Sequence, residues 1–221
     1  EITANKVPTL PKPNKYSKRS KSIIPGVGAI SVGDPGTHLP EGWTRLLILD
    51  VARMESGHTP SRNHPEYWDG DIPWISLSDA RSAHGGMIMD TKDHTNELGI
   101  ANSAARVLPA ETVCLSRTAS VGYVVKLGRE MATSQDFVNW ICSDALLPDW
   151  LHLCILGEGQ NIRKFGSGTT HTTIYYPEVL SLHIDLPPLA EQKRIIAKAN
   201  KMIESIDEAN NLLNQVSLQL I

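Results

Sequence analysis

Residues 166–174, with the sequence GSGTTHTTI, contain one serine, four threonines and one histidine but no lysine, arginine, aspartate or glutamate. Threonine carries a hydroxyl and a methyl group on one short, stiff side chain. Such groups suit the major groove of DNA, where donors, acceptors and the thymine methyl distinguish base edges. Threonine is equally typical of edge strands and turns, so the residues alone leave both interpretations open.

Catalytic motifs are absent from the sequence. It contains no G-x-x-x-x-G-K-[ST] phosphate loop, no H-E-x-x-H and no G-x-S-x-G. The stretch GVGAISVG resembles a dinucleotide loop only loosely, because it follows no predicted strand and opens no helix. Asp149, Glu158 and Gln160 resemble a metal-dependent nuclease motif that lacks its final lysine. The eight histidines show no metal-ligand spacing on an evident helix, so we expect no metal site.

The elements that would position these residues fall into three segments. Residues 1–38 are rich in proline, lysine, serine and glycine without helical or strand periodicity, which predicts a flexible basic tether. Such an arm is either solvated or in contact with a DNA backbone. From residue 39 to residue 186, short apolar runs are broken by glycine, proline, asparagine and aspartate, which predicts a mixed α+β globular domain.

Within this domain we predict six strands and one short helix. Leu180, Leu182, Ile184 and Leu186 alternate with polar residues and predict a strand with one buried face. Pro148 followed by the run WLHLCIL predicts the helix. The predicted strands cover residues 46–49, 74–77, 113–116, 121–127, 137–142 and 179–186.

Residues 187–221 predict one long helix, with Pro188 suited to its first turn. Basic residues crowd its first half (Lys193, Arg194, Lys198, Lys201) and acidic residues its second (Glu204, Asp207, Glu208), so two such helices would attract each other when antiparallel. The alternative is a helix that lies on its own domain. Apolar residues spaced alternately by four and three form a coiled-coil seam: Ile195, Ala199, Met202, Ile206, Ala209, Leu213, Val216 and Leu220.

Composition sets further limits. The 221 residues, 41% of them hydrophobic, suit one globular domain plus an extended part. Three cysteines without a C-x-x-C pair indicate neither a disulfide framework nor a zinc ribbon, and no apolar run would span a bilayer. We therefore expect a cytoplasmic protein without a membrane partner. The net charge of −3 argues against strong DNA binding by this chain alone.

Six stretches occur in the order seen in the specificity subunits of type I restriction-modification systems, and the resemblance covers about residues 39–221. They are LPEGWTRLLILDVARMESGHTP (39–60), YWDGDIPWISLSDA (67–80), VLPAETVCLSRTASVGYV (107–124), ATSQDF (132–137), GSGTTHTTI (166–174) and LPPLAEQKRIIAK (186–198). The resemblance implies a target recognition domain at residues 39–186 that reads one half of a split site in double-stranded DNA. It also implies that the helix at residues 187–221 is a spacer and dimerisation element.

The resemblance implies a non-catalytic chain without a cofactor of its own. Its partners would be methyltransferase subunits that bind S-adenosylmethionine and motor-nuclease subunits that use ATP. Members usually carry two domains and two helices, whereas this chain has one of each. It is therefore either a half-length subunit that pairs with a copy of itself or one half of a longer chain, including a single-chain methyltransferase-nuclease. A third interpretation, favoured by the acidic body, is an assembly protein that does not bind DNA.

With this resemblance, the threonine-rich stretch becomes a candidate DNA-contacting loop, whose glycines would let the backbone approach phosphates. The turn SRTAS (116–120) is a second candidate, in which Arg117 could bind guanine or a phosphate. Gln135, in ATSQDF, is expected to be buried and hydrogen bonded. The candidate DNA-binding residues are Ser116, Arg117, Thr118, Arg163, Lys164, Ser167, Thr169, Thr170, His171, Thr172 and Thr173.

Overall fold

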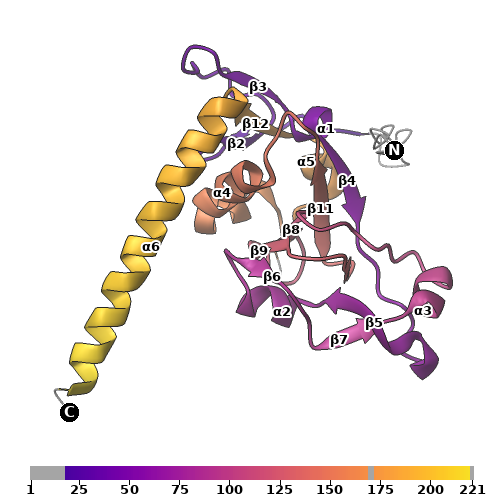
Figure 1. The fold of residues 1–221 in the computed structure, drawn as a ribbon. Coiled ribbons are helices and arrows are strands. Elements are labelled where there is room, and N and C mark those ends of the chain that lie inside the picture. Colours follow the sequence, from indigo (N-terminus) through magenta and orange to yellow (C-terminus); the bar gives the residue numbers. More distant parts are fainter. Residues whose placement is uncertain (1–17, 169–171, 220–221) are drawn as a thin grey trace, which may run out of the picture.

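The computed structural model describes residues 18–168 and 172–219; residues 1–17, 169–171 and 220–221 lie outside the described part. Figure 1 shows a body of short strands and short helices from which one long helix, α6 (Leu189–Gln219), projects along one side. A mixed α+β body followed by a long C-terminal helix is the expected architecture. Within the described ranges, none of the helices is long and apolar enough to cross a membrane.

A four-stranded antiparallel sheet lies at the end of the body from which α6 departs (Figure 1). Its order is β1 (Ile24–Pro25), β2 (Ile30–Val32), β12 (Leu182–Leu186) and β3 (Thr44–Leu47). Strand β12 pairs with β2 on one side and β3 on the other. Leu182 and Ile184 are buried and His183 is only partly covered, as predicted, whereas Ser181 is buried and Leu180 and Leu186 are only half-buried.

The expectation of a flexible tether is wrong for residues 18–38, because this segment supplies β1 and β2. Ile30 and Val32 are 2% and 0% exposed and belong to the main hydrophobic core. The stretch GVGA forms the turn between the two strands, where the backbone N–H groups of Val27 and Gly28 each donate to the Glu158 carboxylate at 2.9 Å. A Cβ atom at Gly26 would lie 2.0 Å from the carbonyl oxygen of Ile30. The globular domain therefore begins well before residue 39.

Two further sheets complete the body. The five-stranded sheet has the order β4 (Ala52–Ser56), β11 (Phe137–Cys142), β8 (Val113–Ser116), β9 (Val124–Leu127) and β6 (Met87–Ile88). The three-stranded sheet has the order β10 (Ala132–Thr133), β5 (Trp68–Ile75) and β7 (Asp93–Thr95). Strands β8 and β11 occupy the predicted residues, because each is a short apolar run whose side chains are mostly buried.

Several predicted boundaries are wrong for local reasons. Residues 48–51 form helix α1 (Ile48–Val51) rather than the end of a strand. Leu77 begins helix α2 (Leu77–Ser82), because Ser76 and Asp79 form a capping box at its start. Val179 ends helix α5 (Tyr176–Val179) before β12 begins. The remaining helices are η1 (Pro65–Tyr67), α3 (Glu97–Ala101), α4 (Pro148–Glu158) and η2 (Gly159–Phe165).

The first turns of α6, which we call the root of α6 (residues 189–198), are anchored on the body by Gln192. This side chain is 1% exposed, and its carbonyl oxygen accepts from the backbone N–H of Leu147, the residue before α4, at 2.9 Å. Its amide nitrogen donates to the carbonyl oxygens of Ala145 at 3.0 Å and Pro187 at 2.9 Å. One glutamine thus joins the end of β12, the start of α4 and α6.

Trp43 and Ile196 make further contacts between the root of α6 and the body. The Nε1 atom of Trp43 donates to Glu191 at 3.2 Å, and the Trp43 ring meets Trp150 of α4 edge to face, with centroids 5.7 Å apart. Ile196 is 8% exposed and packs into the main core. The first part of the helix therefore lies on its own domain.

The remainder, the distal part of α6 (residues 199–219), presents apolar side chains to solvent. Of the predicted seam, Ile195 and Ala199 are half-buried, whereas Met202, Ile206 and Leu213 are 58%, 57% and 65% exposed. Ala209 is also exposed. The side chain of Val216 and all of Leu220 fall outside what the structure describes. An exposed stripe of this kind fits the expected pairing seam, and the pairing itself stays a prediction.

Candidate DNA-contacting surface

The SRTAS turn connects β8 to β9, and its first serine builds the turn. Ser116 is fully buried; its hydroxyl donates to the carbonyl oxygen of Ser120 at 2.5 Å and accepts from the backbone N–H of Tyr123 at 2.8 Å. Ala119 and Gly122 take positive φ angles of 56° and 112° to reverse the chain. The expectation that Ser116 contacts DNA is therefore wrong, because its hydroxyl is enclosed and already bonded within the turn.

Arg117 is held at the surface of this turn by an aromatic ring. Its guanidinium carbon lies 4.5 Å from the centroid of the Tyr176 ring. The two Nη atoms lie 3.5 Å from the carbonyl oxygens of Ile174 and Gln135, at the outer limit of hydrogen bonding, and Nε has no hydrogen-bond partner among the described residues. Nε is buried, so the two weakly used Nη groups, which the ring orients, are the donors that could bind a phosphate or a guanine edge.

The structure brings the two predicted loops together. The backbone N–H of Ile174 donates to the carbonyl oxygen of Arg117 at 2.9 Å. Ser167 and Thr173 exchange two backbone hydrogen bonds of 3.0 and 2.9 Å, which closes the threonine-rich loop at its base. Ser167 is exposed, whereas Thr172 and Thr173 are half-buried. Three further candidates lie outside the described residues: Thr169, Thr170 and His171.

Arg163 and Lys164 lead directly into this loop. Both are exposed in the last turn of η2, and the N–H of Gly166 donates to the carbonyl oxygen of Arg163 at 3.1 Å. A Cβ atom at Gly166 would lie 2.6 Å from the carbonyl oxygen of Thr173, so glycine is needed for the close approach of the two loop ends. The two cations therefore border the loop, as expected.

A third loop, which is not among the predicted DNA-contacting residues, joins the same surface. The hydroxyl of Thr59, in the stretch GHTP, lies 2.5 Å from Oε1 of Gln135. Gln135 is exposed, not buried as expected, and projects from the turn that bonds to Arg117. GHTP and ATSQDF both belong to the stretches that resemble type I specificity subunits. Membership of these stretches is the sequence signal that could have indicated Thr59 and Gln135. We call this connected set the Arg117 surface: Thr59, Arg117, Thr118, Gln135, Ser167, Thr172, Thr173 and Tyr176.

The carboxylates that resembled a nuclease motif have structural partners. Asp149 lies 2.6 Å from Nζ of Lys126, which also contacts Glu111 at 2.8 Å. Burial opposes the charge of Lys126, but hydrogen bonds to Asp149 and Glu111 outweigh this effect and raise its pKa. Glu158 binds the β1–β2 turn. Within residues 18–168 and 172–219, no group of three or more histidine, cysteine, aspartate or glutamate residues could hold a metal ion.

The cysteines also offer no reactive site. Cys114, Cys142 and Cys154 are free, and burial raises the pKa of the Cys142 thiol to about 12. Burial likewise raises the pKa of the other two thiols. All three are therefore protonated near neutral pH, when a thiol is a poor nucleophile.

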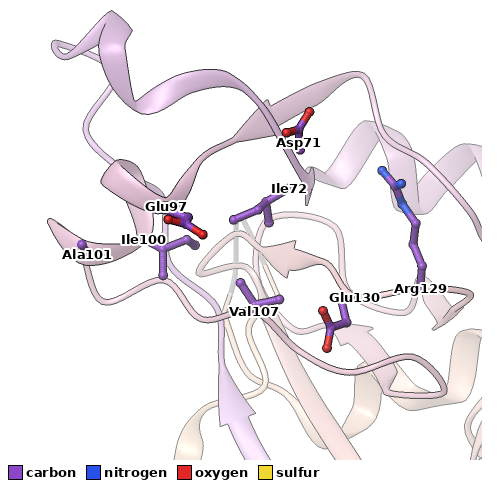
Figure 2. Close-up of a pocket in the computed structure, with 8 residues that line it drawn as sticks. All are labelled: Asp71, Ile72, Glu97, Ile100, Ala101, Val107, Arg129 and Glu130. Atoms are coloured by element: carbon purple, nitrogen blue, oxygen red, sulfur yellow. The ribbon is translucent and has the colours of Figure 1, made fainter.

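An open cleft of about 820 Å³ lies elsewhere on the body, between β5, α3 and the segment before β10. Figure 2 shows Ile72, Ile100 and Val107 at its centre, and it is also lined by Ala101, Arg129 and the carboxylates of Asp71, Glu97 and Glu130. Arg129 lies 3.3 Å from Asp90. Because carboxylates outnumber cations here, the cleft is a poor site for a DNA phosphate.

Comparison with known proteins gives a consistent family. Residues 40–218 match the family model described as the type I restriction modification DNA specificity domain. The chain is 26% identical over 187 residues to the type I restriction enzyme MjaIX specificity subunit of Methanocaldococcus jannaschii, covering 82% of this chain and 43% of that protein. It is 24% identical over 181 residues to the HindI specificity subunit of Haemophilus influenzae, covering 79% of this chain and 39% of that protein.

Solved structures show the same fold. The HsdS subunit from Thermoanaerobacter tengcongensis aligns with a TM-score of 0.62 at 18% identity, covering 79% of this chain and 40% of that chain. A structure from a type I R-M system aligns with a TM-score of 0.63 at 19% identity, covering 80% and 42%. The chain thus spans about two-fifths of the length of the relatives it matches. Because the family model covers most of the chain, this protein belongs to the type I restriction modification DNA specificity domain family.

Proposed function

We propose that this chain reads one half of a bipartite site in double-stranded DNA for a type I restriction-modification complex. In this proposal it is non-catalytic and binds methyltransferase and motor-nuclease subunits, which carry S-adenosylmethionine and ATP. The Arg117 surface, bordered by Arg163 and Lys164, is the part that contacts DNA. The main support for this proposal is the backbone hydrogen bond between Ile174 and Arg117, which joins the two predicted loops into one surface.

The chemistry of this surface supports base reading more than catalysis. It offers a stacked guanidinium, several hydroxyls and a primary amide, which are groups that bind base edges and phosphates. It has few cations, and the chain carries a net charge of −3. We therefore expect weak binding by the chain alone and much tighter binding when methyltransferase subunits add phosphate contacts.

The proposal also assigns a role to the distal part of α6. Its exposed apolar stripe would pack antiparallel against an equivalent helix, from a second copy or from the other half of a longer chain. The 31 residues of α6 span about 46 Å at 1.5 Å per residue, or about 14 base pairs, which is an upper limit for the spacer between half-sites. Self-pairing predicts twice the mass of one chain in light scattering, and a mass of one chain at micromolar concentration would exclude it.

Two other functions compete with this one. A recognition module within a single-chain restriction-methyltransferase enzyme would have the same Arg117 surface, and the native sequence before residue 1 would identify it. An assembly protein that binds only protein is favoured by the acidic cleft and the net negative charge. Only the assembly protein lacks a preferred DNA sequence.

The test is selection from a randomised duplex DNA library by the chain co-purified with its methyltransferase partners. We expect the unaltered protein to enrich one half-site, and Arg117→Ala to weaken binding to that half-site about tenfold, which corresponds to about 1.4 kcal/mol. Arg194→Ala is the matched control, because Arg194 is an exposed arginine on α6. Failure of the unaltered protein to enrich any sequence would leave the assembly protein as the better explanation.

A further inference from the structure

We propose that Gln135 is a specificity-determining residue whose amide binds the major-groove edge of an adenine, and that Thr59 positions it. This inference rests on the proposed function and assigns a base type to one point of the Arg117 surface. The primary amide of Gln135 is an isolated exposed group in a buried part of the chain. Residues 131–134 and 137–140 on either side are all buried.

The turn that carries Gln135 is fixed by its neighbours. The backbone N–H of Ser134 donates to the carbonyl oxygen of Ile75 at 3.0 Å, and the carbonyl oxygen of Asp136 accepts from the N–H of Arg117 at 2.8 Å. The carboxylate of Asp136 accepts from the hydroxyl of Thr118 at 2.5 Å and from that of Ser134 at 3.2 Å. The backbone on both sides of Gln135 is therefore held in place, so the side chain projects from a rigid base.

Gly57 brings the neighbouring loop against this turn. A Cβ atom at Gly57 would lie 2.0 Å from the carbonyl oxygen of Ser134, and the N–H of His58 donates to the carbonyl oxygen of Thr133 at 2.9 Å. The carbonyl oxygen of His58 accepts from the indole N–H of Trp74 at 3.0 Å. These contacts fix Thr59, the next residue, beside Gln135.

The contact between Thr59 and Gln135 prepares the amide for a bidentate interaction. The Thr59 hydroxyl occupies one of the two lone pairs of Oε1, at 2.5 Å. The second lone pair and both hydrogens of Nε2 remain. A glutamine amide binds adenine by accepting from N6–H and donating to N7, so it needs the groups that Thr59 leaves open. Holding the flexible side chain in advance lowers the entropy lost on binding.

Arg117 supports the placement of Gln135 at a base edge. Its Nη2 atom lies 3.5 Å from the backbone carbonyl oxygen of Gln135, so the guanidinium lies against the residue that carries the amide. A guanidinium suits guanine or a phosphate, whereas an amide suits adenine. Neighbouring groups of different base preference are expected on a surface that distinguishes sequences. The competing explanation is structural: the Thr59–Gln135 bond only ties two loops together.

The experiment repeats the library selection with three variants in the complex: Gln135→Ala, Gln135→Glu and Thr59→Val. We expect the unaltered complex to prefer adenine at one position of the half-site, and Gln135→Ala to reduce that preference about tenfold or more. Gln135→Glu should shift the preference toward cytosine, whose N4 donates to a carboxylate. Thr59→Val should weaken binding several-fold and keep the adenine preference. Gln215→Ala, an exposed glutamine on α6, is the control.

Thermal unfolding separates the two explanations. Because Gln135 is exposed, Gln135→Ala should leave the unfolding midpoint of the complex unchanged. An unchanged adenine preference in Gln135→Ala would overturn the assignment while leaving the proposed function intact. A lowered midpoint together with unchanged preference would establish the structural explanation and likewise overturn it. If the unaltered complex enriches no sequence, the proposed function fails first and the assignment fails with it.

Discussion

The two parts of α6 use their side chains in opposite ways. At the root, Gln192 is almost completely buried and makes three hydrogen bonds, and Ile196 lies in the main core. In the distal part, Met202 and Ile206 are more than half exposed. One continuous helix therefore has one end that belongs to the body and another that extends beyond it.

This difference separates anchoring from recognition of a partner. A buried polar group is stable only when its hydrogen bonds are satisfied within the fold, as those of Gln192 are. An exposed apolar stripe gains stability only when a partner covers it. The root therefore fixes the direction of α6, and the distal part presents the surface that we propose pairs with a second helix.

The largest expected effect follows from removing the anchor. Gln192→Ala would leave the N–H of Leu147 and the carbonyl oxygens of Ala145 and Pro187 without their partner. The bond to Pro187 is buried and those to Leu147 and Ala145 are partly buried. We expect the free energy of unfolding to fall by about 3 kcal/mol, since one unsatisfied buried group costs about 1–3 kcal/mol and the two partly buried groups add to this loss. Urea denaturation measures this loss. Gln215→Ala, on the exposed distal part, is the control and should change the free energy of unfolding by under about 0.5 kcal/mol. Equal losses of stability in both variants would contradict the view that only the root of α6 is anchored on the body.

An intermediate effect should follow from charging the stripe. Met202→Lys with Ile206→Lys places two ammonium groups on the proposed seam, which should abolish helix pairing while leaving the body folded. The change would appear as a fall in mass by light scattering or as failure to assemble with a second domain. Ser205→Lys adds one ammonium group at an exposed position outside the predicted seam and should pair normally. Intact pairing in the double variant would show that this stripe is not the interface.

The smallest expected effect is a pH dependence of stability caused by His152. This residue lies in α4, which packs against α6. His152 is 8% exposed, and its Nε2 has no hydrogen-bond partner among the described residues. Burial lowers its pKa, and the nearby charge of Lys126 lowers it further. The folded protein therefore keeps this imidazole neutral at pH values where the unfolded chain, with a pKa of about 6.5, binds a proton.

Stability should consequently fall as pH is lowered through about 6.5 and stop falling below the folded pKa of His152. His152→Leu should flatten this dependence in urea titrations at pH 7, 6 and 5. His38→Leu, at an exposed position, should leave it unchanged. A pH dependence that survives His152→Leu would assign the effect to other groups.

The sequence predicts best where the determining interactions are local. Strands β8 and β11, helix α4 and helix α6 follow from apolar runs, an early proline and a helical repeat. Strands β1 and β2 were missed because their turn depends on Glu158, whose side chain arrives from a distant helix. Glycine and valine in such a stretch show no periodicity of their own.

The candidate surface was predicted in part for similar reasons. The SRTAS turn and the threonine-rich loop were identified by residue type, but their contact through Arg117 and Ile174 arises only from the fold. Ser116 was misassigned because a hydroxyl that closes a turn has the same sequence signature as one that faces a ligand. Gln135 was expected to be buried, and only the geometry of the turn shows that it points outward.

The central place of β12 has a consequence for how this domain forms during synthesis. Strands β2 and β3 emerge early, yet both pair with β12, which is made near the end of the body. At translation rates of roughly 5–20 residues per second, the interval is on the order of ten seconds. During this time β2 has only β1 beside it, and β3 has no strand partner in this sheet. The nascent chain therefore exposes open strand edges until β12 arrives, and this is the period in which a chaperone would be needed most.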